Sequence, residues 1–133
     1  MSDPEEARRM LSIAQRDARA LQAMTDAEDF ATELFAFVAQ QAVEKALKAW
    51  LALTIGEYPK THDLEALFVL LGEQGGNVPL AFRQLEYLTD FAVQFRYSSL
   101  AGPADELDRP SVVAEIRKVL LYVAGLLEHT EGR

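Results

Sequence analysis

Residues 30–55 read FATELFAFVAQQAVEKALKAWLALTI, and this stretch decides the fold class. Its apolar residues recur every three or four positions, which is the spacing of an α-helix and not the alternation of a β-strand. They cover nearly the whole circumference of that helix, so it must be buried against several neighbours, or against neighbours and a second subunit. The sequence therefore predicts a buried helix over about 29–54 that ends before Gly56.

The same spacing predicts four more helices, over about 4–24, 63–72, 79–97 and 110–128, and no strands. Asp3 and Pro4 suit the N-cap and the first helical position of the first of these. Thr61 or His62 is expected to cap the helix that begins near residue 63. Apart from a long polar loop over 98–110, the links are short, which favours an all-α, antiparallel bundle. The length suits a single domain over 1–133, with a core over about 4–128.

Composition excludes several classes of protein. Half of the residues are apolar and 26% are charged, as in a globular domain. The chain has no cysteine, and its two histidines lie far apart, so we expect no disulfide, no metal site and no cofactor. The net charge of −8 argues against a protein that holds nucleic acid by its overall electrostatic field.

The sequence predicts a cytoplasmic protein without a membrane span. The N-terminus is acidic and has no apolar core, so it does not resemble a secretory signal. Each charged side chain at the centre of a membrane costs roughly 2.5–3.5 kcal/mol on insertion scales. The most apolar stretch carries four of them, Glu33, Glu44, Lys45 and Lys48.

Two sets of polar residues lie at helical spacing, and each has two interpretations. The first set forms the face of helix 4–24 opposite its apolar stripe, and is either a solvated surface or a ridge that contacts phosphate. The second set is a narrow strip on helix 29–54, and is either an internal ion-pair seam or a groove that binds phosphate and a base edge. The first comprises Arg8, Arg9, Arg16 and Arg19, and the second comprises Gln41, Glu44, Lys45 and Lys48.

The apolar surface of the helices over 29–54 and 110–128 exceeds what one neighbouring helix covers. Large apolar patches are uncommon on monomers, so self-association is favoured. A symmetric homodimer is the commonest outcome, and we predict one.

Three ordered segments carry a family resemblance. Residues 40–49 read QQAVEKALKA, residues 61–64 read THDL and are followed by Leu67, and residues 96–97 read RY. Together they resemble the HEPN domain family, in its nucleotidyltransferase-associated branch, over roughly residues 5–128. The resemblance implies an up-and-down four-helix bundle with an additional fifth helix, usually as a dimer. It also implies a small nucleotidyltransferase partner in a toxin–antitoxin-like pair.

Many HEPN proteins are metal-independent endoribonucleases, and these place an Arg and a His four to six residues apart. The resemblance aligns Arg96 with that arginine, but the residues at the matching offsets are Leu100 to Pro103, and the next histidine is His129. Metal-free cleavage of RNA needs a group that titrates near neutral pH, and arginine does not. Whether the protein is an enzyme therefore stays open. His62 is an alternative base, and its other interpretation is a structural role at the start of its helix.

The favoured interpretation is an HEPN-like domain that binds RNA or a nucleotide. Its predicted ligand-binding residues are Gln41, Glu44, Lys45, Lys48 and Tyr97. The alternatives are a ribonuclease that uses Arg96 and His62, and a non-catalytic interaction bundle. The binding interpretation requires that Arg96 and the strip on helix 29–54 meet at one cleft.

Overall fold

The computed structural model describes residues 2–25, 30–90 and 107–131. Every regular element in these ranges is helical, which confirms the predicted all-α class. The elements are α1 (Pro4–Met24), α2 (Thr32–Ile55), α3 (Leu64–Glu73), α4 (Leu80–Arg83), the 3₁₀ helix η1 (Gln84–Tyr87) and α6 (Arg109–Glu131).

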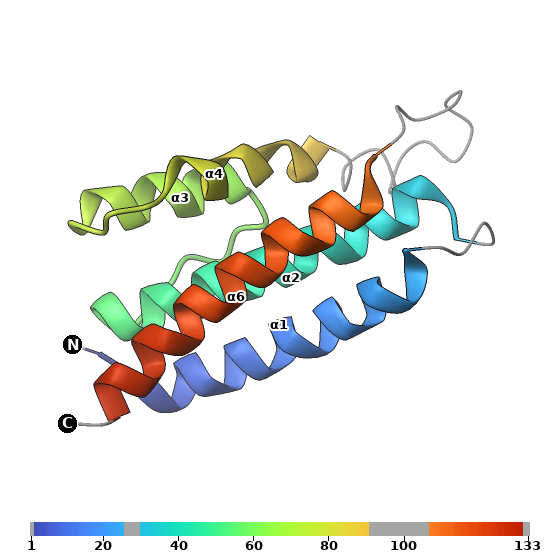
Figure 1. Cartoon of the computed structure of the whole chain (residues 1–133). Helices are drawn as coiled ribbons and strands as arrows, with labels where there is room; N and C mark the ends of the chain where they lie inside the picture. Colours follow the sequence, from blue (N-terminus) through green and yellow to red (C-terminus); the bar gives the residue numbers. More distant parts are fainter. Residues whose placement is uncertain (1, 26–29, 91–106, 132–133) are drawn as a thin grey trace.

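The three long helices lie side by side, with α3 and α4 across one side of them (Figure 1). α1 and α2 run in opposite directions, and α6 runs in the same direction as α2. α2 packs against α1, α6 and α3, so it holds the largest share of the core. Its fully buried side chains include Phe35, Leu47 and Leu51. The prediction of a buried helix here is confirmed.

The ends of α1 and α2 follow from local chemistry. The Asp3 side chain accepts a hydrogen bond from the Glu6 amide, as expected for an N-cap before Pro4. α2 ends at Gly56, whose φ of 80° lies in the left-handed region that glycine adopts without a steric penalty. α2 begins at Thr32, three residues later than predicted, and residues 26–29 lie outside the described ranges.

The predicted cap of α3 is wrong. Asp63 caps this helix, because its carboxylate accepts a hydrogen bond from the Glu65 amide at 3.0 Å. Thr61 instead accepts a hydrogen bond from the Asp63 amide, and the His62 ring turns toward α2. Thr61 and Asp63 both have side chains suited to an N-cap, and Asp63 is the residue that accepts a hydrogen bond from an amide of the helix.

The helix predicted over 79–97 starts with α4 and tightens into η1 before Leu88. Residues 91–106 lie outside the described ranges, and they include the rest of that helix and most of the loop predicted over 98–110. α6 extends the helix predicted over 110–128 by one residue at its start and three at its end. No helix of the described ranges is long and apolar enough to cross a membrane.

Candidate functional site

α2 places three polar side chains in the interior of the bundle. Gln40, Glu44 and Lys48 follow one another at intervals of four residues and therefore share one side of the helix. Their exposed fractions are 1%, 0% and 7%, and they are the buried polar residues of the described ranges. A buried charge is costly unless it is paired and hydrogen-bonded, so the contacts of Glu44 determine what this site can do.

The Glu44 carboxylate is the centre of a polar network. Its Oε2 atom lies 2.9 Å from Lys48 Nζ and 3.3 Å from Lys45 Nζ. Its Oε1 atom lies 3.0 Å from His62 Nδ1 and 3.2 Å from Gln40 Nε2. Four side chains from two segments therefore converge on one carboxylate, which we call the Glu44 network.

The charge state of Glu44 determines the role of His62. Burial alone would raise the pKa of Glu44, but the hydrogen bonds from Lys48 and His62 and the charges of Lys45 and Lys48 outweigh it. The pKa of Glu44 is therefore lowered, and the group is ionised at neutral pH. An ionised carboxylate only accepts hydrogen bonds, so His62 Nδ1 must carry a hydrogen. In a neutral His62 ring the lone pair then lies on Nε2.

The two glutamines complete the hydrogen bonding of the network. Gln40 Nε2 also donates to the His62 carbonyl oxygen at 2.6 Å, and this bond joins α2 to the segment before α3. Gln41 Nε2 donates to Gln40 Oε1 at 2.8 Å, and Lys45 Nζ donates to Gln41 Oε1 at 3.3 Å. No buried side-chain nitrogen or oxygen in the described ranges lacks a hydrogen-bond partner.

A second chain of contacts leads from Lys48 to the start of α1. Lys48 Nζ lies 5.5 Å from the centre of the Tyr58 ring, within the range of a cation–π contact. The Tyr58 hydroxyl donates to Glu6, which also accepts two hydrogen bonds of 2.7 Å from Arg9. The hydrogen bonds from Arg9 and Tyr58 lower the pKa of Glu6 to about 2. Desolvation and the Glu6 charge raise the pKa of Tyr58.

The structure brings Gln41, Glu44, Lys45 and Lys48 together with His62. Their contacts with one another are those expected of the internal ion-pair seam. Lys45 and His62 lie at the edge of this group of side chains that faces solvent. The side chains of Lys45 and His62 are 21% and 62% exposed. Binding of a ligand by these residues stays a prediction.

Arg96 and Tyr97 lie outside the described ranges, so the predicted meeting of Arg96 with this strip stays a prediction as well.

Sequence reasoning missed Gln40, Tyr58 and Glu6 as members of this arrangement. Gln40 could have been found, because it stands four residues before Glu44 in the segment that carries the family resemblance. Tyr58 and Glu6 are 52 residues apart in the sequence, and no local pattern connects them.

The exposed arginines of α1 do not form a uniform cationic ridge. Three of them contact carboxylates: Arg8 contacts Glu131, Arg9 contacts Glu6, and Arg16 lies 3.6 Å from Asp17. Arg19, the fourth, lines a groove between α1 and α6 together with Arg117. The arginine face is therefore mostly neutralised by acidic neighbours.

The fold and the network define a class of protein, a small all-α bundle whose second helix carries a buried carboxylate network. Residues 7–126 match the HEPN domain, so the chain belongs to the HEPN domain family. The comparisons with curated proteins and with solved structures found no match.

Proposed function

We propose that this HEPN domain binds RNA or a nucleotide at the exposed edge of the Glu44 network and acts with a small nucleotidyltransferase in a toxin–antitoxin-like pair. The observation that supports binding is the shared contact of Lys45 and His62 with the Glu44 carboxylate. Because both side chains touch the same group and are partly exposed, one phosphate can reach both of them.

The local charge favours an anionic ligand. Two lysines, Lys45 and Lys48, face one carboxylate, so the network is positive overall although the chain has a net charge of −8. Glu44 fixes the position of both edge groups, so a ligand does not have to order them on binding. The predicted contacts of Arg96 and Tyr97 would add a second cation and a stacking surface for a base.

Binding is tested by titrating the protein with adenosine 5′-monophosphate and with a short single-stranded RNA. A charged hydrogen bond contributes about 1.5–3 kcal/mol. The Lys45→Gln variant should therefore bind either ligand at least about tenfold more weakly than the unaltered protein does. The matched control is Lys60→Gln, which removes an exposed lysine that lies outside the network. Absence of binding by the unaltered protein, or an equal loss in both variants, would contradict the proposal.

The proposed assembly is a homodimer that engages the nucleotidyltransferase partner. Several large apolar side chains of the described ranges remain exposed, with Leu80 at 75% and Val69 at 43%. Light scattering should give twice the mass of the chain. Co-purification with a small nucleotidyltransferase encoded beside it should give a stable complex, and failure to retain that protein would count against the pairing.

The second candidate function is metal-independent cleavage of RNA, and the Glu44–His62 contact favours it. With Nδ1–H donated to Glu44, Nε2 of a neutral His62 can accept the proton of a ribose 2′-hydroxyl. The 2′-oxygen then attacks the adjacent phosphate and displaces the 5′-oxygen of the next nucleotide, which takes a proton from water and leaves as a hydroxyl group. In this mechanism Glu44 orients the base, and Arg96 is the predicted cation for the phosphate.

This candidate predicts that the protein degrades RNA in the presence of a chelator and leaves 2′,3′-cyclic phosphate ends. His62→Ala should abolish cleavage, whereas His129→Ala, which removes the other histidine, should retain it. If the protein binds RNA but no cyclic phosphate forms, the binding proposal stands and the ribonuclease alternative is discarded. If it neither binds nor cleaves, the non-catalytic interaction bundle is favoured.

A further inference from the structure

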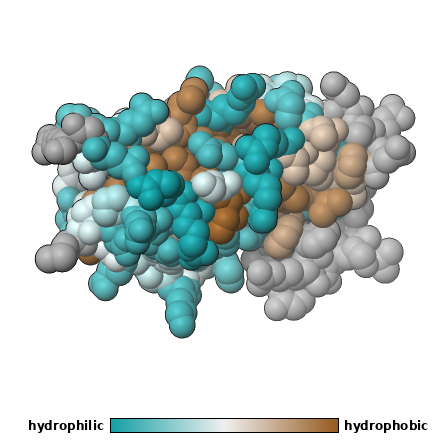
Figure 2. Space-filling model, turned by 90° about the horizontal axis from the view of Figure 1, so that it is seen from below, coloured by the Kyte–Doolittle hydropathy of each residue, from teal (hydrophilic) through white to brown (hydrophobic). Residues whose placement is uncertain are grey.

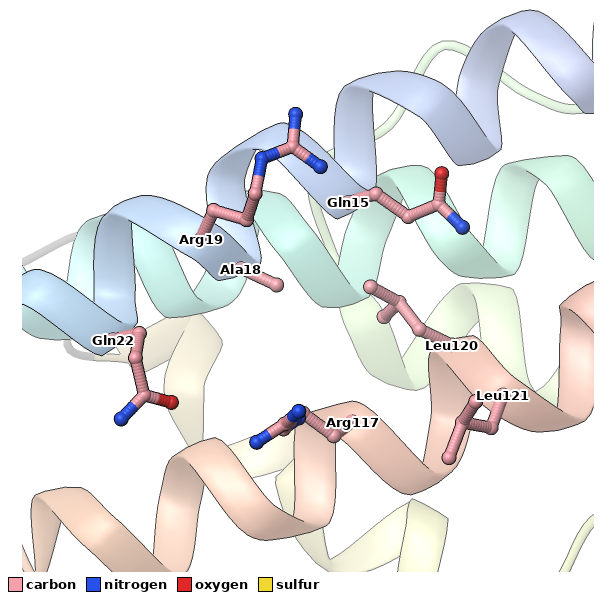
Figure 3. A pocket seen from close by; sticks show the side chains of 7 residues that line it. All are labelled: Gln15, Ala18, Arg19, Gln22, Arg117, Leu120 and Leu121. Carbon is pink, nitrogen blue, oxygen red and sulfur yellow. The ribbon is translucent and has the colours of Figure 1, made fainter.

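A groove runs between α1 and α6 and shares no residue with the Glu44 network (Figure 3). Gln15, Arg19 and Gln22 line one wall from α1, and Arg117, Leu120 and Leu121 line the other from α6. Its volume is about 460 Å³, which lies within the range of small-molecule sites in proteins. The groove is therefore large enough for a ligand of the size of a substituted aromatic phosphate.

The two arginines of the groove differ from the other arginines around them. Within the part of the chain that the structure describes, neither Arg19 nor Arg117 forms an ion pair or a hydrogen bond. Arg8, Arg9 and Arg16, on the same helix as Arg19, each contact a carboxylate. Acidic residues outnumber lysines and arginines by 21 to 13, so two arginines without an acidic partner in one groove are unexpected. Their charge is open to an anion from solution.

The rest of the lining is suited to a flat apolar body with polar edges. Leu121 is 73% exposed and Leu120 points from α6 toward α1 in Figure 3. The amides of Gln15 and Gln22 provide both donors and acceptors on the opposite wall. Figure 2, which views the molecule from the side on which α1 lies, shows hydrophobic side chains at the surface between hydrophilic ones.

We infer that this groove is a second binding site, for an organic phosphate that carries a planar ring. The phosphate contacts Arg117, and the exposed Arg19 side chain, whose guanidinium points away from Arg117 in Figure 3, turns toward the groove to make the second contact. Guanidinium groups match the geometry of phosphate oxygens. The ring lies on Leu120 and Leu121, and the two glutamines contact its polar edge. The same chemistry is offered by a free nucleotide and by a phosphorylated end of an RNA chain.

The groove is tested by calorimetric titration with phenyl phosphate, inorganic phosphate and phenol. Phenyl phosphate should bind more tightly than either of the other two, because it alone engages both the arginines and the leucines. Arg117→Gln should weaken the binding of phenyl phosphate about tenfold or more. Leu121→Ser should weaken phenyl phosphate but leave inorganic phosphate unchanged. The control is Arg16→Gln, one turn before Arg19, where the arginine already contacts Asp17.

The inference is overturned if phenyl phosphate shows no saturable binding, if Arg117→Gln and Arg16→Gln lose the same affinity, or if phenol binds as tightly as phenyl phosphate. Circular dichroism verifies that each variant is folded, and Arg19→Gln provides a second test of the arginine pair. Titrations with adenosine 5′-monophosphate and with a 5′-phosphorylated RNA hexamer then show whether the groove prefers a free nucleotide or the phosphorylated end of an RNA chain.

The Lys45→Gln variant separates this site from the proposed function. It should retain the binding of phenyl phosphate in the groove whether or not the Glu44 network binds RNA. Loss of that binding in Lys45→Gln would assign the phosphate to the network and overturn the groove.

Discussion

The Glu44 network and the α1/α6 groove differ in whether their charged side chains are buried and paired. In the network, a fully buried carboxylate contacts two lysines, a histidine and a glutamine. In the groove, Arg19 and Arg117 reach solvent without a carboxylate partner in the described ranges. The residues of the network all lie in two of the three segments that carry the family resemblance, 40–49 and 61–64, whereas the groove contains no residue of these segments.

The difference separates the residues that hold the bundle together from those that are open to a ligand. A buried ion pair with all its hydrogen bonds fixes how helices pack, and removing one partner leaves an uncompensated charge. An exposed arginine contributes little to stability and costs little to change. Stability measurements should therefore distinguish the two regions, and the predictions below run from the largest expected effect to the smallest.

Glu44→Gln should have the largest effect. Removal of the negative charge leaves Lys48 buried without an ionic partner, which costs roughly 3–5 kcal/mol in comparable pairs. Urea denaturation measures the loss in the free energy of unfolding. Glu65→Gln, at an exposed position of α3, is the control and should change it by less than about 0.5 kcal/mol.

If Glu44→Gln does not fold, the double variant Glu44→Leu with Lys48→Met gives the same information. Replacing both partners of a buried pair by apolar side chains is often neutral, so the double variant should be more stable than Glu44→Leu alone. Equal stability of Glu44→Leu and the double variant would show that the unpaired charge of Lys48 is not the cause of the lost stability.

Tyr58→Phe should have a smaller effect. It removes the hydrogen bond to Glu6 but retains the ring beside Lys48, so the expected loss is about 1 kcal/mol. Tyr122→Phe is the matched control, because the Tyr122 ring packs against Trp50 and Phe82 while its hydroxyl has no hydrogen bond in the described ranges. A loss of the same size in both variants would contradict the role given to the Tyr58 hydroxyl.

Glu6→Gln should change how stability depends on pH. The pKa of Glu6 is lowered from 4.5 to about 2. The contribution of its ionised carboxylate to the free energy of unfolding is therefore fully present above pH 4.5 and is lost as the pH falls through about 2. The ion pair is partly exposed and solvent screens it, so the contribution is below about 1 kcal/mol. The difference in melting temperature between the unaltered protein and Glu6→Gln should shrink over that pH range. A constant difference would show that the charge of Glu6 is not involved.

Arg117→Gln should have the smallest effect on stability. Its side chain has no partner in the described ranges to lose, so the free energy of unfolding should change by less than about 0.5 kcal/mol. Thermal and urea denaturation both measure this. A loss above about 1 kcal/mol would show that the groove arginine is structural and would remove the contrast between the two regions.

Sequence periodicity predicted the helices well because the buried side of each helix requires an apolar residue every three or four positions. α1 was predicted over its observed range, and the all-round apolar character of residues 30–55 predicted the buried position of α2. The cap of α3 was missed because Thr61 and Asp63, which lie two residues apart, both have side chains that cap helices. Gln40 and Glu44 hold the backbone and the ring of His62 from another helix, and this contact follows from no local pattern.

The candidate site was predictable only in its local part. The contact between Glu44 and Lys48 agrees with the ion-pair seam, one of the two interpretations that the helical spacing of the strip left open. The contact between Glu44 and His62 joins residues 18 apart, and the groove joins residues of the first and last helices. Such contacts follow from the packing of whole helices, which a pattern within one helix does not contain.

Arg109 at the start of α6 has a consequence for synthesis of the chain. Its guanidinium donates to the carbonyl oxygens of Met24 and Phe30, which lie 85 and 79 residues earlier. Neither carbonyl can accept these hydrogen bonds before Arg109 has been synthesised. The connection between α1 and α2 is therefore fastened to α6 only after the ribosome has added Arg109.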